Sequence, residues 1–216
     1  VLTTDHGHLL SEHGYWAKNY MFDYQELVHI PLVVCAPDVA PRRVPALTSA
    51  IDMMPTFMEL YGADLPPHVH GRSLRHLFDR DHKHHDAVLY GYFGKDVNMT
   101  DGRYTYCRQP LPGSTLYHHT AMPCSFNDFH GRQQLAAAAC GTFLKNTYGI
   151  PHFRFQVDSR RHHGAPDFNP IYDISADPHQ ERPLRDAELE AQLSTRLKDL
   201  LERFDAPECQ YPRLGF

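Results

Sequence analysis

The sequence has no long hydrophobic run, no paired-cysteine motif and no extended cluster of basic side chains. Because a membrane-spanning helix needs about 20 consecutive apolar residues, we expect no membrane-spanning segment and no membrane partner. The formal net charge of -5 and the scattered Lys and Arg residues argue against a nucleic-acid partner, since phosphate binding requires clustered cations. The five cysteines include no C-x-x-C pair, so the sequence predicts neither a zinc knuckle nor a complete disulfide framework.

An initiator methionine and a signal sequence are also missing, because the chain begins with Val1-Leu2-Thr3-Thr4. These residues are typical of the end of a buried strand, and a strand needs neighbours to satisfy its backbone groups. We therefore expect an upstream part of the same protein to supply the rest of a sheet. The localisation stays unknown at this stage, although unpaired thiols favour a reducing, cytoplasmic compartment.

The composition is that of a globular chain, with 42% hydrophobic and 22% charged residues. Its 216 residues are enough for one domain or two small ones. The apolar run Leu27–Ala36 predicts a second strand after the N-terminal one. Asp52 is a predicted cap for a helix over residues 53–61, and leucines at helical spacing predict a packed helix between Asp186 and Pro207.

Four short runs rich in β-branched and aromatic residues predict a small antiparallel sheet. They are Val88–Phe93, Arg103–Arg108, Phe153–Val157 and Ile171–Ile174. The segment between the second and third runs is predicted to hold a long insertion over 110–132 and a short helix over 133–145. Long loops often shape substrate pockets, so substrate contact by 117–119 or 127–130 is an open alternative.

Histidine is abundant, with 17 residues, and two clusters of it invite a metal interpretation. These are His82-Lys83-His84-His85 and Arg160-Arg161-His162-His163. Both occur in polar, loop-like stretches without a carboxylate or cysteine at ligand spacing. We therefore expect solvated surface clusters and assign them no role.

The residues that carry chemistry are concentrated near the N-terminus, where Asp5-His6-Gly7 follows the first predicted strand. Asp5 offers a carboxylate oxygen and His6 an imidazole nitrogen to a divalent cation, while Gly7 permits a tight backbone turn. Lys18 offers an ammonium that can neutralise charge on a sulfuryl or phosphoryl group. His13 is predicted either to contact a substrate oxygen or ligand, or to be a packed, hydrogen-bonded side chain.

Five blocks of the chain, in order, resemble the sulfatases of the alkaline-phosphatase superfamily. The first, TTDHGHLLSEHGYWAKNYMFD, resembles their second signature block. The others resemble the family's I-D-x-x-P-T helix, G-x-S-L turn, T-D-G-R-Y-K-Y strand and L-Y-D-L-x-x-D-P-x-E segment. They are AIDMMPTF at 50–57, HGRSL at 70–74, TDGRYTY at 100–106 and IYDISADPHQE at 171–181.

This resemblance implies an α/β fold. Residues 1–80 would form the C-terminal part of the catalytic α/β domain, at the end of a large mixed sheet. Residues 81–216 would form a C-terminal subdomain in which a small four-stranded antiparallel sheet packs against a terminal helix.

The resemblance also implies a site and an activity. Asp5 and His6 would be ligands of a divalent cation, usually Ca²⁺ with Mg²⁺ or Mn²⁺ as alternatives, and His6 stands where many members have Asn. Lys18 would contact the sulfate oxygens, and we name Lys18 and His13 as candidate catalytic residues. The family nucleophile, a formylglycine made in a C/S-x-P-x-R motif, is expected upstream and is absent from these residues.

Three functions remain open from the sequence. The first is a sulfuric ester hydrolase acting on a small-molecule or carbohydrate sulfate ester, with this fragment alone inactive. The second keeps the fold but acts on a phosphate diester or a phosphonate monoester, because the same cation and lysine suit both tetrahedral anions. The third is a non-catalytic structural or binding module.

Overall fold

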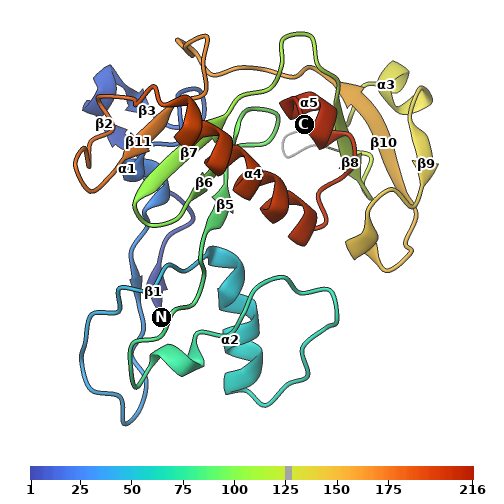
Figure 1. The fold of residues 1–216 in the computed structure, drawn as a ribbon. Helices are drawn as coiled ribbons and strands as arrows, with labels where there is room; N and C mark the ends of the chain where they lie inside the picture. Colours follow the sequence, from blue (N-terminus) through green and yellow to red (C-terminus); the bar gives the residue numbers. More distant parts are fainter. Residues whose placement is uncertain (125–127) are drawn as a thin grey trace.

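A four-stranded antiparallel sheet forms the centre of the chain in the computed structural model, which describes residues 1–124 and 128–216. Its strand order is β11-β7-β6-β5 (Figure 1). The strands are β5 Val88–Tyr90, β6 Val97–Thr100, β7 Tyr104–Arg108 and β11 Ile171–Asp173. Three of the four predicted strand runs are thus confirmed as members of one sheet.

The long helix α4 (Ala187–Arg203) crosses one face of this sheet (Figure 1). It begins where the Asp186 carboxylate accepts hydrogen bonds from the amides of Glu188 at 3.0 Å and Leu189 at 2.9 Å. These bonds satisfy amide groups that the first turn of a helix leaves free. Its apolar stripe packs on the sheet, and the buried core residues are Met99, Tyr106, Ile171, Leu193, Leu197 and Leu200. The predicted cap and the predicted packing face are both confirmed.

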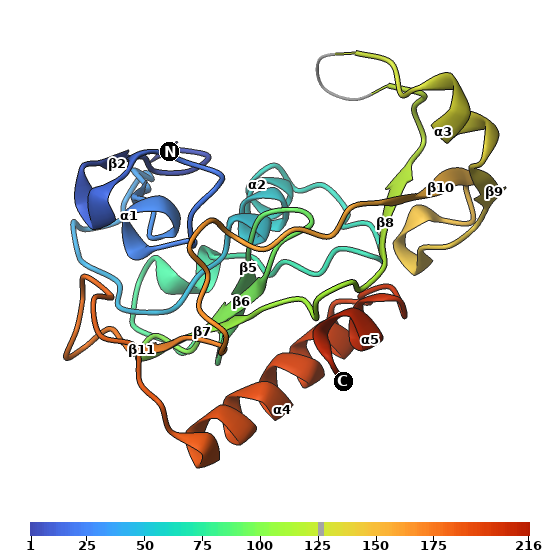
Figure 2. The ribbon, with the colours of Figure 1, turned by 90° about the horizontal axis from the view of Figure 1, so that it is seen from above.

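The N-terminal segment lies on the opposite side of the sheet from α4 (Figure 2). It contains two short antiparallel pairs, β1 with β4 and β2 with β3. Their bounds are β1 Leu2–Thr3, β2 Leu9–Leu10, β3 Trp16–Ala17 and β4 Leu32–Val33. Helix α1 (Gln25–Val28) and helix α2 (Met53–Leu60) complete this part.

The predicted insertion supplies one strand, β8, of a second sheet whose strand order is β8-β10-β9 (Figure 1). The strands are β8 Leu116–Thr120, β9 Ala139–Gly141 and β10 His152–Val157. The prediction that 153–157 joins the central sheet was therefore wrong, because Phe153 to Val157 pair with Thr120 to Leu116. An alternating run identifies a strand, but its partner depends on long-range packing that the local pattern does not contain.

The helix predicted over 133–145 is also shorter than expected. Helix α3 spans Arg132–Ala136 and gives way to β9, which pairs with β10. The chain ends in the short helix α5 (Gln210–Leu214). Within the described residues, no helix combines the length and the apolarity needed to cross a bilayer.

Candidate functional site

Asp5, His6 and Lys18 lie together just beyond the end of β1. His6 Nε2 is 2.5 Å from Lys18 Nζ and 3.2 Å from Asp5 Oδ2. The other ring nitrogen, Nδ1, is 2.8 Å from the carbonyl oxygen of Gly7. Because a carbonyl can only accept, Nδ1 carries the proton, and the lone pair of a neutral His6 is on Nε2. The Nε2 lone pair therefore accepts a hydrogen bond from the Lys18 ammonium, and a cation bound to Nε2 would take the place of that ammonium beside the Asp5 carboxylate.

Gly7 sets the path of the chain through this group. Its amide donates to the carbonyl of Leu27 at 2.8 Å. A Cβ at this position would lie 1.8 Å from the carbonyl oxygen of Glu26, a distance that no side chain tolerates. The sequence Asp5-His6-Gly7 can thus pack directly on α1, which holds Asp5 and His6 in place.

Lys18 reaches the group because β2 and β3 form a hairpin. Leu9 pairs with Ala17 and Leu10 pairs with Trp16. Leu9 is fully buried and packs with Met21 and Leu27. This apolar packing holds the hairpin in place. The residue after β3 is thereby returned to the side of His6.

The Asp5 carboxyl group is open to its surroundings, with 81% of its side chain exposed against 39% for His6. Slight desolvation raises its pKa, but the hydrogen bond from the His6 amide and the charge of the His6 ring outweigh it. The net pKa of Asp5 lies below its usual value. Asp5 is therefore ionised at neutral pH and available as a ligand for a cation.

His13 is held apart from this group. Its ring stacks on Tyr24, with centroids 3.6 Å apart, and its Nε2 is 3.6 Å from Glu26 Oε2. Its side chain is 10% exposed. Within the described residues, no hydrogen bond or ion pair joins His13 to Asp5, His6 or Lys18. His13 is therefore a packed side chain, as one of the two sequence-based alternatives predicted. A catalytic role for His13 stays a prediction.

A cavity of about 890 Å³ adjoins the residues that follow Lys18. Asn19 and Tyr20 form part of its wall. The opposite side comes from the β5–β6 connection, from the three-stranded sheet and from the loop after β10. Its basic and imidazole side chains are Lys95, Arg160, Arg161 and His163.

Comparisons with known proteins match parts of this chain to sulfatases. The family profile described as "N-sulphoglucosamine sulphohydrolase, C-terminal" matches residues 11–108. Arylsulfatase K of Mus musculus is 37% identical over 75 residues, which cover 34% of this chain and 13% of that protein. N-acetylglucosamine-6-O-sulfatase of Bacteroides thetaiotaomicron is 32% identical over 85 residues, covering 38% of this chain and 15% of that protein.

A similar fold occurs in a solved structure over almost the whole chain. The solved structure of a 2-O GAG sulfatase superposes with a TM-score of 0.55 at 16% identity. The superposition covers 94% of this chain and 35% of that one. Over the matched residues the chain is similar to the C-terminal portion of sulfatases. The chain spans about a third of the solved structure that it matches, and the fold class implied by the sequence blocks is confirmed.

The structure overturns the prediction that the histidine clusters of this chain are solvated. His84, His85 and His162 are each 4% exposed, whereas His82 and His163 are on the surface. Each buried histidine lies against an aspartate from a distant segment. Among the described residues, two groups of this kind bring their ligand atoms within 4.8 Å of one another: Asp52 with His84 and His85, and Asp23 with Asp96 and His162.

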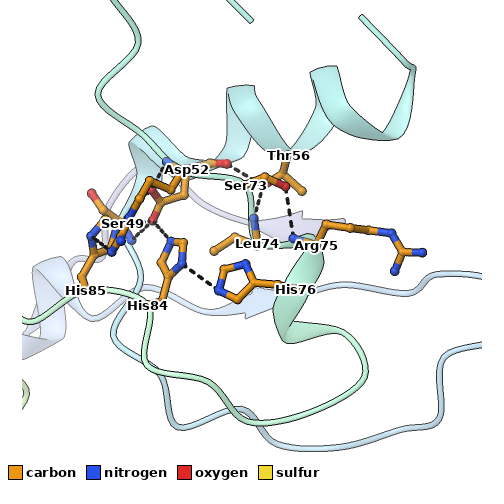
Figure 3. Close-up of polar contacts among 10 residues, drawn as sticks. Ser49, Asp52, Thr56, Ser73, Leu74, Arg75, His76, His84 and His85 are labelled. Atoms are coloured by element: carbon orange, nitrogen blue, oxygen red, sulfur yellow. Dashed lines mark hydrogen bonds and ion pairs between the residues drawn. The ribbon is translucent and has the colours of Figure 1, made fainter. Parts of the chain in front are cut away.

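The Asp52 group is a packing hub (Figure 3). The fully buried carboxylate accepts hydrogen bonds from the amides of Ser49 at 2.8 Å and Arg72 at 2.9 Å. His85 Nε2 lies 2.9 Å from its Oδ2, and His84 Nε2 lies 3.2 Å from the same oxygen. The prediction that the Asp52 side chain caps α2 is wrong, because its carboxylate makes no capping hydrogen bond to that helix. The carboxylate instead joins the start of α2 to the 72 turn and to the 84–85 segment.

No local pattern in the sequence predicts these two aspartate–histidine groups. Asp52 and His85 are far apart in the sequence, and the polar residues around His84 are typical of a loop. The alternatives left open for the insertion stay predictions. Residues 117–119 lie in β8, and Asn127 lies outside the described residues.

Proposed function

We propose that the protein to which this chain belongs hydrolyses a sulfate ester of a carbohydrate. The observation that supports this most directly is that His6 Nε2 lies 2.5 Å from Lys18 Nζ and 3.2 Å from Asp5 Oδ2. These residues occur in a block that resembles a sulfatase signature. Matches to sulfatases in sequence and in fold support the same reading.

Asp5 and His6 fit a divalent cation, because an ionised carboxylate oxygen and an imidazole lone pair lie 3.2 Å apart. That separation suits two ligands of one ion with bond lengths of about 2.1–2.5 Å. We propose Ca²⁺, with Mg²⁺ and Mn²⁺ as alternatives. When bound, such a cation would polarise the oxygens of a sulfuryl group.

Lys18 would act on the ester itself. Its ammonium lies at hydrogen-bond distance from His6 and can donate to an anionic oxygen placed beside that ring. Charge that builds up on sulfuryl oxygens as the ester bond breaks is stabilised by a fixed cationic donor. The 216 residues contain no C/S-x-P-x-R motif, so we propose that a formylglycine nucleophile comes from another part of the protein.

The proposed substrate class is a sulfated sugar. One relative is named for a 6-O-sulfated N-acetylglucosamine, and the solved neighbour is described as a 2-O GAG sulfatase. The cavity beside Asn19 offers Lys95, Arg160 and Arg161, which would favour further anionic groups on such a sugar.

Paired turnover assays on the intact protein test this proposal. We expect release of sulfate from sulfated monosaccharides with a kcat/KM at least tenfold above that for a matched phosphonate monoester. Removal of divalent cations with a chelator should abolish turnover, and Ca²⁺ should restore it. A preference for the phosphonate would replace the sulfatase assignment with the phosphoryl one, and no turnover of either would favour a non-catalytic module.

A further inference from the structure

A second group of ionisable side chains, Asp23, Asp96 and His162, lies where three segments meet. Asp23 precedes α1, Asp96 ends the connection between β5 and β6, and His162 is in the loop after β10. That loop runs back from β10 towards the N-terminal segment (Figure 2), where the amide of His163 donates to the carbonyl of Tyr20 at 2.9 Å. The group thus joins the segment that carries Lys18 to the C-terminal part of the chain.

The polar atoms of this group are buried but poorly satisfied. The side chains of Asp96 and His162 are each 1% exposed and in direct contact, Asp96 Oδ1 with His162 Nε2. Both carboxylate oxygens of Asp96, and His162 Nε2, have no partner with hydrogen-bond geometry. Asn98 is fully buried, and its Oδ1 also has no hydrogen-bond partner. Its Nδ2 donates to Asp23 Oδ2 at 3.3 Å. Buried polar atoms without partners cost free energy, and each one calls for an explanation.

Neighbouring cations compensate this negative charge only in part. Lys95 Nζ donates to the carbonyl of Asn19 at 2.7 Å and lies 3.3 Å from His162 Nδ1. Burial and the charge of Asp96 still raise the pKa of Asp23 to about 6. Two carboxylates this close repel each other unless a positive charge lies between them.

We propose that Asp23, Asp96 and His162 bind a divalent transition-metal ion that ties the Lys18 segment to the central sheet. Two carboxylates and one imidazole are a donor set for Zn²⁺ or Mn²⁺, which bind both carboxylate oxygen and imidazole nitrogen. The ligand atoms lie within 4.8 Å of one another, close enough to converge on a single ion. The ion would be a structural one, since Asp96 and His162 are buried and none of the three residues belongs to the Asp5, His6 and Lys18 group.

A shared proton between His162 and Asp96 is the competing arrangement. In it Lys95 would donate to Nδ1, and Nε2 would donate to Asp96 Oδ1. That arrangement leaves Asp96 Oδ2 and Asn98 Oδ1 without donors, and a buried water would have to supply them. The two arrangements differ in one measurable property, which is metal stoichiometry.

Adjacent histidines provide a matched pair of variants, because His162 is buried and His163 is exposed. The intact protein is stripped with a chelator and dialysed against Zn²⁺, and bound metal is counted by elemental analysis. We expect His162→Ala to bind one equivalent less than the native protein and His163→Ala to match the native protein. Zn²⁺ should also raise the melting temperature of the native protein and of His163→Ala, but not that of His162→Ala.

Asp23→Asn is the milder second variant, because Asp23 is partly exposed and the amide oxygen can still accept from Asn98. It too should lose one equivalent of Zn²⁺, whereas the exposed Asp79→Asn should lose none. Equal Zn²⁺ uptake by the native protein, His162→Ala and Asp23→Asn would contradict the proposed metal site. It would support the arrangement in which His162 and Asp96 share a proton. That result would not touch the proposed function, because Asp5, His6 and Lys18 share no ligand with this group.

Discussion

Replacing Asp52 with alanine is the sharpest test of how the N-terminal part is held together. The fully buried carboxylate accepts from the Ser49 and Arg72 amides at 2.8 and 2.9 Å and contacts His85 at 2.9 Å. Asp52→Ala would leave the two amides and the buried His85 ring without this partner. Hydrogen bonds to a charged group contribute about 1.5–3 kcal/mol each, and removing one partner of a buried pair costs about 3–5 kcal/mol. We expect a loss of about 3–5 kcal/mol in the free energy of unfolding.

Urea denaturation of the intact protein, followed by tryptophan fluorescence and by circular dichroism, measures this loss. The matched control is Asp64→Ala, because Asp64 is an exposed residue after α2, and its effect should stay within about 0.5 kcal/mol. A loss below about 1 kcal/mol for Asp52→Ala would refute the reasoning that this carboxylate is the hub.

Acid provides a second measurement on the same residue. Burial raises the pKa of Asp52, but hydrogen bonds from His85, Arg72 and Ser49 outweigh it, so the folded-state pKa is lowered. The unfolded chain then binds the proton more readily, and stability from Asp52 is full above about pH 4. It is lost as the pH falls through the lower folded-state value. The stability of Asp52→Ala should therefore depend less on pH below 4 than that of the native protein.

Two further substitutions test the packing of the sheet and of the site. Leu197→Ala removes a fully buried side chain between α4 and the sheet and should cost about 2–5 kcal/mol in urea unfolding. The adjacent exposed Lys198→Ala should cost less than about 0.5 kcal/mol, and equal effects would contradict the assigned packing face. Gly7→Ala places a Cβ 1.8 Å from a backbone oxygen and should lower both melting temperature and kcat/KM. Gly131→Ala, with no atom within 4 Å of the new Cβ, is its control, and native behaviour of Gly7→Ala would show that Gly7 does not position the site.

Local patterns were sufficient for elements whose own residues repeat with a helical or alternating period. The apolar stripe after Asp186 predicted α4, and short alternating runs predicted β5, β7 and β11 of the central sheet. The hydrogen-bonded hairpin of β2 and β3 explains why Lys18 lies beside His6.

Long-range packing decided the rest. Strand β10 was predicted in the wrong sheet because its pairing with β8 depends on how the insertion folds. His84 looked like a surface residue because its partner, Asp52, is supplied by another segment and its neighbours are polar. A polar stretch can be buried when a distant carboxylate neutralises it, and no composition rule detects that partner.

The central claim is that Lys18, beside Asp5 and His6, acts on a sulfate ester. Its most direct test is kcat/KM for sulfate release by the intact Lys18→Ala protein, compared with Lys198→Ala, which changes an exposed lysine on α4. Loss of one fixed donor to the transition state predicts a fall of about 10²–10³-fold for Lys18→Ala and native activity for Lys198→Ala. Equal kcat/KM for the two variants would contradict the account.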